Sequence, residues 1–311
     1  GHRHIVRFKE DYVDQRNHYQ VIEMCNGGDM FAYVANKGMQ NQHLCGRVFS
    51  QMVSAVAYLH SMGIVHLDIS LEQLMLSENE RKEHEVKLLD WGQARFFSGG
   101  KEFKYVYGKD LYRAPEVWSC RRQGPFDGRK ADVFCLGVVL ALTFLGWPPF
   151  KTSLSPNYLK IAFKEDGLQS ILRGYGKREL AKAMEETKLT DLITRMLAPV
   201  ERRLSIEQII AHPWFLAHAP KGAPGAILHI LKHKEVPLMY QPPPVQIDKM
   251  GPVERKMVLE FVAKQAKRCG NNDQRSNLLK ELATQFRIQD PNFTQNLLRW
   301  AITQLSGKGG G

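Results

Sequence analysis

Residues 66–76, HLDISLEQLML, place His66 and Asp68 two positions apart, ahead of polar residues and a short apolar run. A His-x-Asp in this order is typical of a catalytic loop that leads into a β-strand. The chemistry that it suggests is phosphoryl transfer. Two positions inside the loop are unusual for that chemistry, so the sequence raises the question of whether the loop is functional or a remnant.

The elements that would position this loop follow from the spacing of apolar residues. Residues 5–8 and 19–24 are predicted as short strands joined by the polar stretch EDYVDQRN, and the two glycines of CNGGD predict a turn. Helical spacing begins at Asp29 and returns over residues 43–62. Residues 73–76 and 86–90 are predicted as strands around a polar surface turn. Most of the remaining chain to Leu216 is predicted to be helical.

Composition and charge limit the class of protein. The chain has 311 residues, 43% of them hydrophobic, which is typical of a globular protein with a substantial core. Its formal charge of +11 favours acidic partners such as nucleotides, nucleic acid or anionic lipid. No block of consecutive Lys and Arg residues concentrates that charge, so we expect a solvated basic surface and regard nucleic acid as an unfavoured partner.

Neither a secretion signal nor a membrane span is expected. The first residues, GHRHIVRFKEDYV, contain no apolar signal core. The longest apolar run, residues 133–147, is too short for a membrane span and ends at WPPF, so it predicts a buried helix. Five scattered cysteines without a C-x-x-C motif predict reduced thiols and an intracellular, cytoplasmic location; they are Cys25, Cys45, Cys120, Cys135 and Cys269.

Several separated fragments together resemble the protein kinase family, from His4 to Phe215. In chain order they are IEMCNGGDMF, HLDISLEQLML, LLDWGQA, YRAPE, KADVFCLGVVL and RRLSIEQIIAHPWF. They resemble the hinge, the catalytic loop, the metal-binding loop, the end of the activation segment, the central buried helix and the closing helices. Six such fragments in family order are far more specific than one. The GGD, GWPPF and HPWF segments are most similar to the calcium/calmodulin-dependent or calcium-dependent branch of serine/threonine kinases.

The resemblance implies a fold class and a domain organisation. We expect an α+β fold, mainly α, in which a kinase-like C-lobe carries a remnant of the N-lobe sheet. The predicted boundaries are 1–24 for the N-lobe remnant, 25–219 for the C-lobe, 220–252 for a Pro-rich linker and 253–306 for a helical module. The module resembles a degenerate EF-hand, with a generic helical hairpin as the alternative. Because QDPNFTQNLL lacks the calcium ligands, no Ca²⁺ is expected.

The resemblance also implies a role for individual residues. Asp68 matches the aspartate that accepts the proton of the substrate hydroxyl, and Asp90 the aspartate that holds Mg²⁺ against the phosphates of ATP. The remaining nucleotide-binding positions are the gatekeeper Ile22, the hinge residues Glu23, Met24 and Cys25, the ribose-contacting Asp29, and the apolar Met75 under the base. Glu72 matches an acid that meets a substrate arginine in many basophilic kinases. Glu116 and Arg203 match a buried structural pair, and Asp132 is a further structural residue.

The catalytic loop departs from the family pattern H-R-D-x-K-x-x-N at three positions. Leu67 replaces the arginine that gathers a phosphorylated activation loop, and Ser70 replaces the lysine that stabilises the transferring phosphoryl group. Gln73 replaces the metal-binding asparagine and is one methylene longer, whereas Mg²⁺ tolerates little displacement of a ligand. After Gly108, where the family usually has threonine, stands Lys109. Hydroxyl and cation have therefore exchanged positions, and we predict that the Lys109 ammonium lies beside Asp68. The alternative is that Lys109 is a solvent-exposed lysine of a loop.

No Gly-rich loop and no V-A-I-K strand precede Ile5. Two explanations stay open: an N-lobe precedes these residues in a longer protein, or the chain lacks one. For these 311 residues we therefore expect a pseudokinase or scaffold that binds a protein partner, with weak or no binding of ATP and Mg²⁺. The alternative is an active serine/threonine kinase that phosphorylates protein substrates. A nucleic-acid binder is a third, weaker reading that rests on charge alone.

Overall fold

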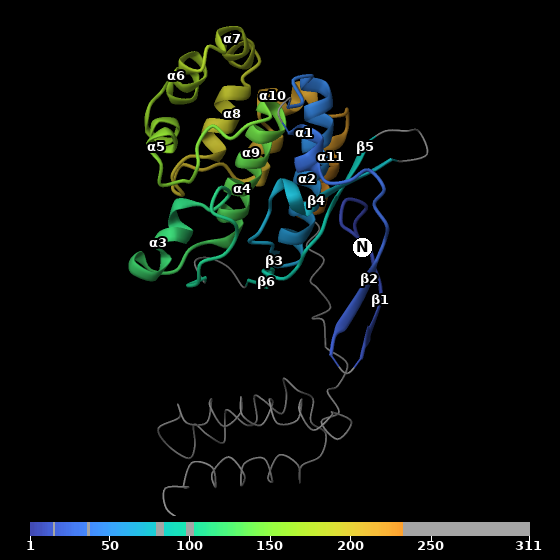
Figure 1. Cartoon of the computed structure of the whole chain (residues 1–311). Helices are drawn as coiled ribbons and strands as arrows, with labels where there is room; N and C mark the ends of the chain where they lie inside the picture. The colour runs from blue at the N-terminus through green and yellow to red at the C-terminus, as the bar shows by residue number, and fades with distance from the viewer. Residues whose placement is uncertain (15, 36–37, 79–83, 98–102, 233–311) are drawn as a thin grey trace, which may run out of the picture. The chain divides into compact units, whose positions relative to one another are not determined.

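The computed structural model describes residues 1–14, 16–35, 38–78, 84–97 and 103–232. These residues form a mainly helical body with three two-stranded antiparallel sheets, β1–β2, β3–β6 and β4–β5 (Figure 1). The strands are β1 Phe8–Val13, β2 His18–Ile22, β3 Ile64–Val65, β4 Leu74–Glu78, β5 His84–Leu88 and β6 Arg95–Phe96. The helices are α1 Met30–Val34, α2 Gln42–Ser61, the 3₁₀ turn η1 Leu71–Gln73, α3 Pro115–Gln123, α4 Gly128–Leu145, α5 Pro156–Phe163, α6 Gly167–Gly174, α7 Arg178–Glu186, α8 Leu189–Met196, α9 Ile206–Ile210, α10 Pro213–His218 and α11 Ala223–Lys232. The predicted α+β, mainly α, class is confirmed.

Two central helices form the core of the body. The predicted helix over residues 43–62 is α2, and Asn41 caps it by accepting a 3.1 Å hydrogen bond from the Leu44 N–H. Its predicted apolar stripe is buried. The predicted buried helix over residues 133–145 is the second half of α4, which Asp127 caps and which ends at Gly146 in the left-handed region, with φ of 80°. Within the described residues, no helix is long and apolar enough to cross a membrane.

The first strand was predicted at the wrong place. Residues 5–8 were expected to be extended, but β1 covers Phe8–Val13 and pairs with β2 through the stretch expected to be a polar connection. Cross-strand side chains explain the shift, because the rings of Tyr12 and Tyr19 stack at 4.9 Å and His18 Nε2 lies 2.6 Å from Asp11 Oδ2. A polar hairpin of this kind depends on pairing between its strands rather than on burial.

The β4–β5 hairpin was predicted correctly. Leu74 faces Leu88, and Met75 faces Lys87, in antiparallel register. Leu74, Leu76, Val86 and Leu88 are buried, as their alternation with partly exposed residues requires. This hairpin follows the catalytic loop directly and ends just before Asp90, so it fixes the distance between the two aspartates of the site.

The linker predicted over residues 220–252 begins instead with a helix. Residues Ala223–Lys232 form α11, which packs against α2 and buries Ile227. Pro224 lies in the first turn, where a missing N–H breaks no helical hydrogen bond, so the Pro and Gly residues that suggested a linker are compatible with a helix. The rest of that linker and the predicted module at 253–306 lie outside the described residues.

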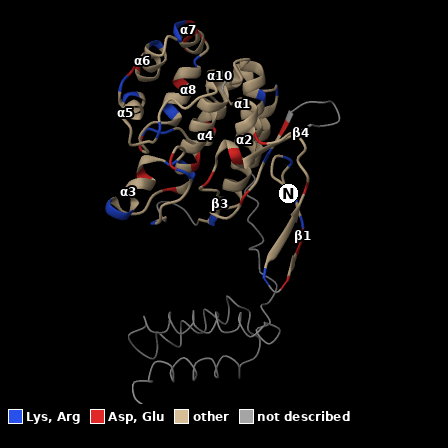
Figure 2. Cartoon of the chain, viewed as in Figure 1, with Lys and Arg blue, Asp and Glu red and all other residues tan. Residues whose placement is uncertain are grey.

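Charged residues are interspersed over the described elements. In Figure 2 lysines and arginines lie among aspartates and glutamates rather than on one element. The four described cysteines, Cys25, Cys45, Cys120 and Cys135, are free thiols, as predicted.

Candidate active site

The backbone of the catalytic loop is held by a buried carboxylate from α4. Asp132 Oδ2 accepts hydrogen bonds of 2.9 Å from the His66 N–H and from His60 Nε2, and Oδ1 accepts one of 2.8 Å from the Leu67 N–H. Leu67 adopts a left-handed conformation with φ of 65°, which is uncommon for a residue with a branched side chain. Two hydrogen bonds from the loop backbone to one fully buried aspartate explain how the loop keeps this conformation.

Asp68 is 7% exposed, and its two carboxylate oxygens have different surroundings. Oδ2 accepts a 2.9 Å hydrogen bond from the side-chain amide of Gln93. Oδ1 is buried and has no hydrogen-bond partner among the described residues. Burial raises the pKa of Asp68 above its usual value, although the charge of Lys109 opposes the shift. A buried carboxylate oxygen without a partner is costly, which makes Oδ1 a place where a ligand hydroxyl can donate a hydrogen bond.

His66 also orients the catalytic loop through its two ring nitrogens. Its Nδ1 accepts a 3.3 Å hydrogen bond from the Asp68 N–H, and its Nε2 lies 3.2 Å from the carbonyl oxygen of Leu89. These two partners fix the tautomer, because Nδ1 must be unprotonated and Nε2 must carry the proton. Burial lowers the pKa of His66, which agrees with a neutral imidazole.

Lys109 lies next to Ser70, the residue with which it has exchanged position. Its ammonium donates a 2.9 Å hydrogen bond to Ser70 Oγ and pairs with Glu72 Oε2 at 3.4 Å. The ammonium forms no ion pair with Asp68 among the described residues, but its charge is close enough to oppose the rise in the pKa of Asp68. The turn η1 begins after Ser70 and contains Glu72, so the side chains of both residues lie nearest to the Lys109 ammonium.

Glu72 is satisfied from within the chain. Burial raises its pKa, but hydrogen bonds from its own N–H and from the Ser70 hydroxyl, together with Lys109, outweigh burial and leave the pKa lowered. The carboxylate is therefore ionised, and Ser70 connects it to the Lys109 ammonium.

Asp90 and Gln73 come together at the end of the β4–β5 hairpin. Gln73 Nε2 donates a 2.7 Å hydrogen bond to Asp90 Oδ2, and the Gly92 N–H donates one of 3.1 Å to Oδ1. Asp90 has a left-handed backbone with φ of 65°. The additional methylene of Gln73 allows its amide to reach this carboxylate.

The nucleotide-binding positions predicted from the sequence lie along β2 and the segment after it. Ile22 ends β2, and the exposed Met24 side chain precedes Cys25, whose pKa is raised by burial. Glu23 has a structural role, since Oε1 accepts a 2.9 Å hydrogen bond from the Arg7 N–H and pairs with Lys87 at 3.1 Å.

Asp29 and Met75 are neighbours through a β-bridge. The Asp29 carboxylate caps α1 by accepting a 2.7 Å hydrogen bond from the Ala32 N–H, so it has a structural role, and its contact with ribose stays a prediction. The two positions expected to contact ribose and base are thus adjacent in space.

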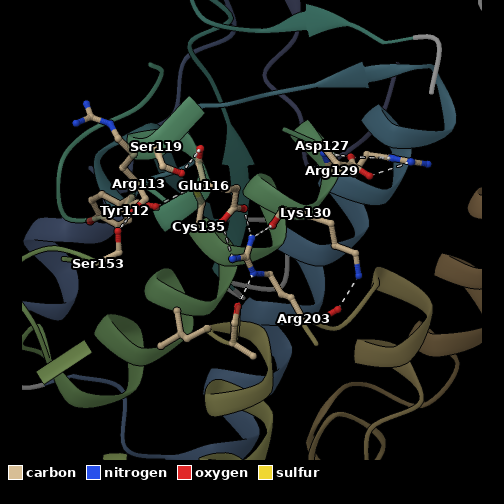
Figure 3. A network of polar contacts seen from close by, with 12 residues as sticks. Tyr112, Arg113, Glu116, Ser119, Asp127, Arg129, Lys130, Cys135, Ser153 and Arg203 are labelled. Atoms are coloured by element: carbon tan, nitrogen blue, oxygen red, sulfur yellow. Dashed lines mark hydrogen bonds and ion pairs between the residues drawn. The ribbon is translucent and has the colours of Figure 1, made fainter. Parts of the chain in front are cut away.

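A buried ion pair joins the end of the activation segment to the helices behind it. The Arg203 guanidinium pairs with both carboxylate oxygens of Glu116, with 2.9 Å between Nη2 and Oε2, and also donates to the carbonyls of Ala198 and Lys130 (Figure 3). The Arg203 side chain is fully buried and lies over the ring of Phe134 at 5.0 Å. Its surroundings are those of a structural residue.

Comparison with known proteins assigns the family. The model of the protein kinase domain matches residues 1–215. The chain belongs to the protein kinase family. Its relatives include calcium-dependent protein kinases 14 and 32 of Arabidopsis thaliana, 30% and 32% identical over 68% and 73% of this chain. Calcium-dependent protein kinase 21 of Oryza sativa subsp. japonica is 33% identical over 68% of this chain. These alignments span 35–39% of the length of the relatives.

The candidate site has a ligand set that fits Mg²⁺. The Asp90 carboxylate is on an exposed residue, and Gln73 can present its amide oxygen there by rotating the amide. Mg²⁺ in phosphate-transferring sites is usually held by one or two carboxylates, water and the substrate phosphates, so this oxygen set is sufficient in kind. Within the described part of the chain, no group of three or more His, Cys, Asp and Glu residues forms a separate metal site.

Sequence reasoning missed one residue of this candidate site, Gln93. Its amide donates to Asp68 Oδ2 at 2.9 Å and accepts a 2.7 Å hydrogen bond from the Gly108 N–H. The sequence contained one signal, because Gln93 follows Asp90 by three residues in LLDWGQA. A polar residue directly after Asp90, Trp91 and Gly92 is close enough to contact the catalytic loop. The second partner of Gln93, the Gly108 N–H, comes from a distant part of the chain.

Proposed function

We propose that this chain is the catalytic and substrate-binding part of a protein serine/threonine kinase, with Lys109 supplying the cation that family members have in the catalytic loop. One observation carries the proposal. The Lys109 ammonium lies 2.9 Å from the hydroxyl of Ser70, in the loop whose Asp68 has a buried, unpartnered Oδ1. The exchange of lysine and hydroxyl between positions 70 and 109 thus keeps both groups in contact.

The chemistry follows from these positions. Asp68 Oδ1 would accept a hydrogen bond from the substrate hydroxyl and orient it. As the hydroxyl oxygen bonds to phosphorus, the bond from phosphorus to the bridging oxygen of the leaving ADP would break, and the Asp68 carboxylate would take the hydroxyl proton. The raised pKa of Asp68 makes it a better proton acceptor than an exposed aspartate. The positive charge of Lys109 stabilises negative charge that develops nearby.

Asp90 and Gln73 are the residues that would hold Mg²⁺ at this site, and the segment from Ile22 to Asp29, with Met75, would hold the nucleotide. ATP supplies the phosphoryl group when it is bound. Leu67 places an apolar side chain where a phosphorylated activation segment would need a cation. Its presence supports activity without phosphorylation of that segment.

A second candidate function is a protein-binding module with the kinase fold and no phosphoryl transfer. The observation in its favour is the 2.7 Å hydrogen bond between Gln73 and Asp90, which occupies a carboxylate oxygen that the metal needs. In that case the domain would act through its surface, on a protein partner.

The experiment compares Lys109→Met with Lys109→Arg and Lys104→Met in the full-length protein. Lys104 is an exposed lysine of the same segment and serves as the matched control. We expect Lys109→Met to lower kcat about 100-fold, as the loss of one charge-stabilising donor does, Lys109→Arg to retain part of the activity, and Lys104→Met to equal the wild type. Equal activity of Lys109→Met and wild type would refute the role of Lys109. No phosphoryl transfer by wild-type protein with MgATP and peptide substrates would favour the second function.

A further inference from the structure

Gln93 connects two segments that are otherwise separate, the catalytic loop and the chain around Gly108. Asp68 as a carboxylate can only accept hydrogen bonds, and the backbone N–H of Gly108 can only donate one. The orientation of the Gln93 amide is therefore fixed: its nitrogen faces Asp68 Oδ2 at 2.9 Å, and its oxygen faces the Gly108 nitrogen at 2.7 Å. One side chain satisfies both groups at once.

Gly108 lies directly against the catalytic loop. Its φ is +74°, and a Cβ atom at this position would come within 2.9 Å of the Leu67 carbonyl oxygen and 3.8 Å of Asp68 Oδ1. On its other side the Gly108 carbonyl accepts a hydrogen bond from Arg113. The guanidinium of Arg113 also donates to the Tyr107 carbonyl at 2.9 Å and stacks over Trp118 at 4.1 Å. Gly108 is thus held through its carbonyl by Arg113 and through its N–H by Gln93.

We propose that Gln93 is a positioning residue that fixes the carboxylate plane of Asp68, leaves Oδ1 without a hydrogen bond from the described residues, and anchors the activation segment at Gly108. The role of Gln93 in catalysis rests on the proposed function. The attachment of Asp68 to Gly108 through Gln93, called the clamp from here on, rests on the two hydrogen bonds alone. Since Leu67 offers no cation for a phosphorylated segment, this amide gives the segment an uncharged attachment to the catalytic loop.

Two substitutions separate the two halves of the clamp. Gln93→Leu removes both the donor to Asp68 and the acceptor for Gly108. Gln93→Glu keeps an acceptor for the Gly108 N–H but places a second carboxylate against Asp68. Gln123→Leu is the control, because Gln123 is an exposed glutamine of α3 that also accepts a hydrogen bond, of 2.8 Å from Ser119 Oγ.

The first readout is hydrogen exchange of the Gly108 amide, measured by NMR on the 311-residue chain. We expect exchange about five- to tenfold faster in Gln93→Leu, in line with the loss of one hydrogen bond, and unchanged exchange in Gln93→Glu and Gln123→Leu. The second readout is the titration of the Asp68 carboxyl carbon. The charged or titratable groups around Asp68 are Lys109, His66, Asp90 and the Cys135 thiol of α4, and none of them is altered by these variants.

Gln93→Glu should move the Asp68 titration to higher pH by more than about one unit, because two adjacent carboxylates resist joint ionisation. Gln93→Leu should raise it less, since only a hydrogen bond to the ionised form is lost. In the full-length kinase, Gln93→Leu should lower kcat about 10- to 100-fold, as expected for a misplaced catalytic group, with KM for ATP unchanged.

Unchanged Gly108 exchange in Gln93→Leu, or an unchanged Asp68 titration in Gln93→Glu, would overturn the clamp. Wild-type kcat in Gln93→Leu would overturn its positioning role. If the wild-type protein transfers no phosphate, the proposed function fails, and exchange and titration still decide whether Gln93 holds both segments.

Discussion

Replacement of Arg203 by methionine should destabilise the described body strongly, because it leaves the Glu116 carboxylate without its cation. Removal of one partner from a buried ion pair usually costs about 3–5 kcal/mol. The Glu116 side chain is 14% exposed and can reach water, whereas the Arg203 side chain is fully buried. We therefore expect a loss near the lower limit, about 3 kcal/mol. For a domain of this size, that corresponds to a fall in Tm of roughly 6–12 °C.

The assay is urea unfolding followed by tryptophan fluorescence. The double variant Arg203→Met/Glu116→Leu should be more stable than Arg203→Met alone, because an apolar pair leaves no buried charge uncompensated. Lys182→Met is the control, since Lys182 and Glu186 form an exposed pair at 3.9 Å that should contribute ~0–1 kcal/mol. A decrease in the free energy of unfolding of less than about 1 kcal/mol in Arg203→Met would refute the buried-pair argument. So would a double variant whose decrease equals the sum of the decreases in Arg203→Met and Glu116→Leu.

Three further predictions concern pH, nucleotide and calcium. Burial lowers the pKa of both His4 and His2 to about 4, so the unfolded chain binds these protons at higher pH than the folded chain does. The free energy of unfolding should therefore fall as the pH drops from about 6.5 to 4, and His4→Gln should weaken that dependence in unfolding titrations while His2 retains its share. These 311 residues contain no Gly-rich loop and should bind MgATP weakly or not at all, which micromolar affinity in calorimetry would contradict. Ca²⁺ should leave Tm unchanged, and a Ca²⁺-dependent increase abolished by Asp290→Ala would disprove this.

Much of the architecture could be predicted from the sequence because its determinants are local. The helical stripes of α2 and α4 and the alternation in β4 and β5 are set by residues close together in the chain, and their periods identify the element directly. The order of the kinase fragments predicted the family, and residues 1–215 match the kinase domain. Local patterns failed where pairing or packing decided the outcome, as in the β1–β2 hairpin and α11.

The details of the site depend on contacts between distant segments, which only the tertiary structure decides. The sequence alone predicted that Lys109 and Ser70 had exchanged roles, but the fold directs the ammonium to Ser70 and Glu72 rather than to Asp68. Nothing in the sequence specified the partners of Gln93, because Gly108 lies 15 residues away and Asp68 lies 25 residues away. Residue type limits the hydrogen bonds that a side chain can form. The packing of the catalytic loop against the activation segment determines which of them it does form.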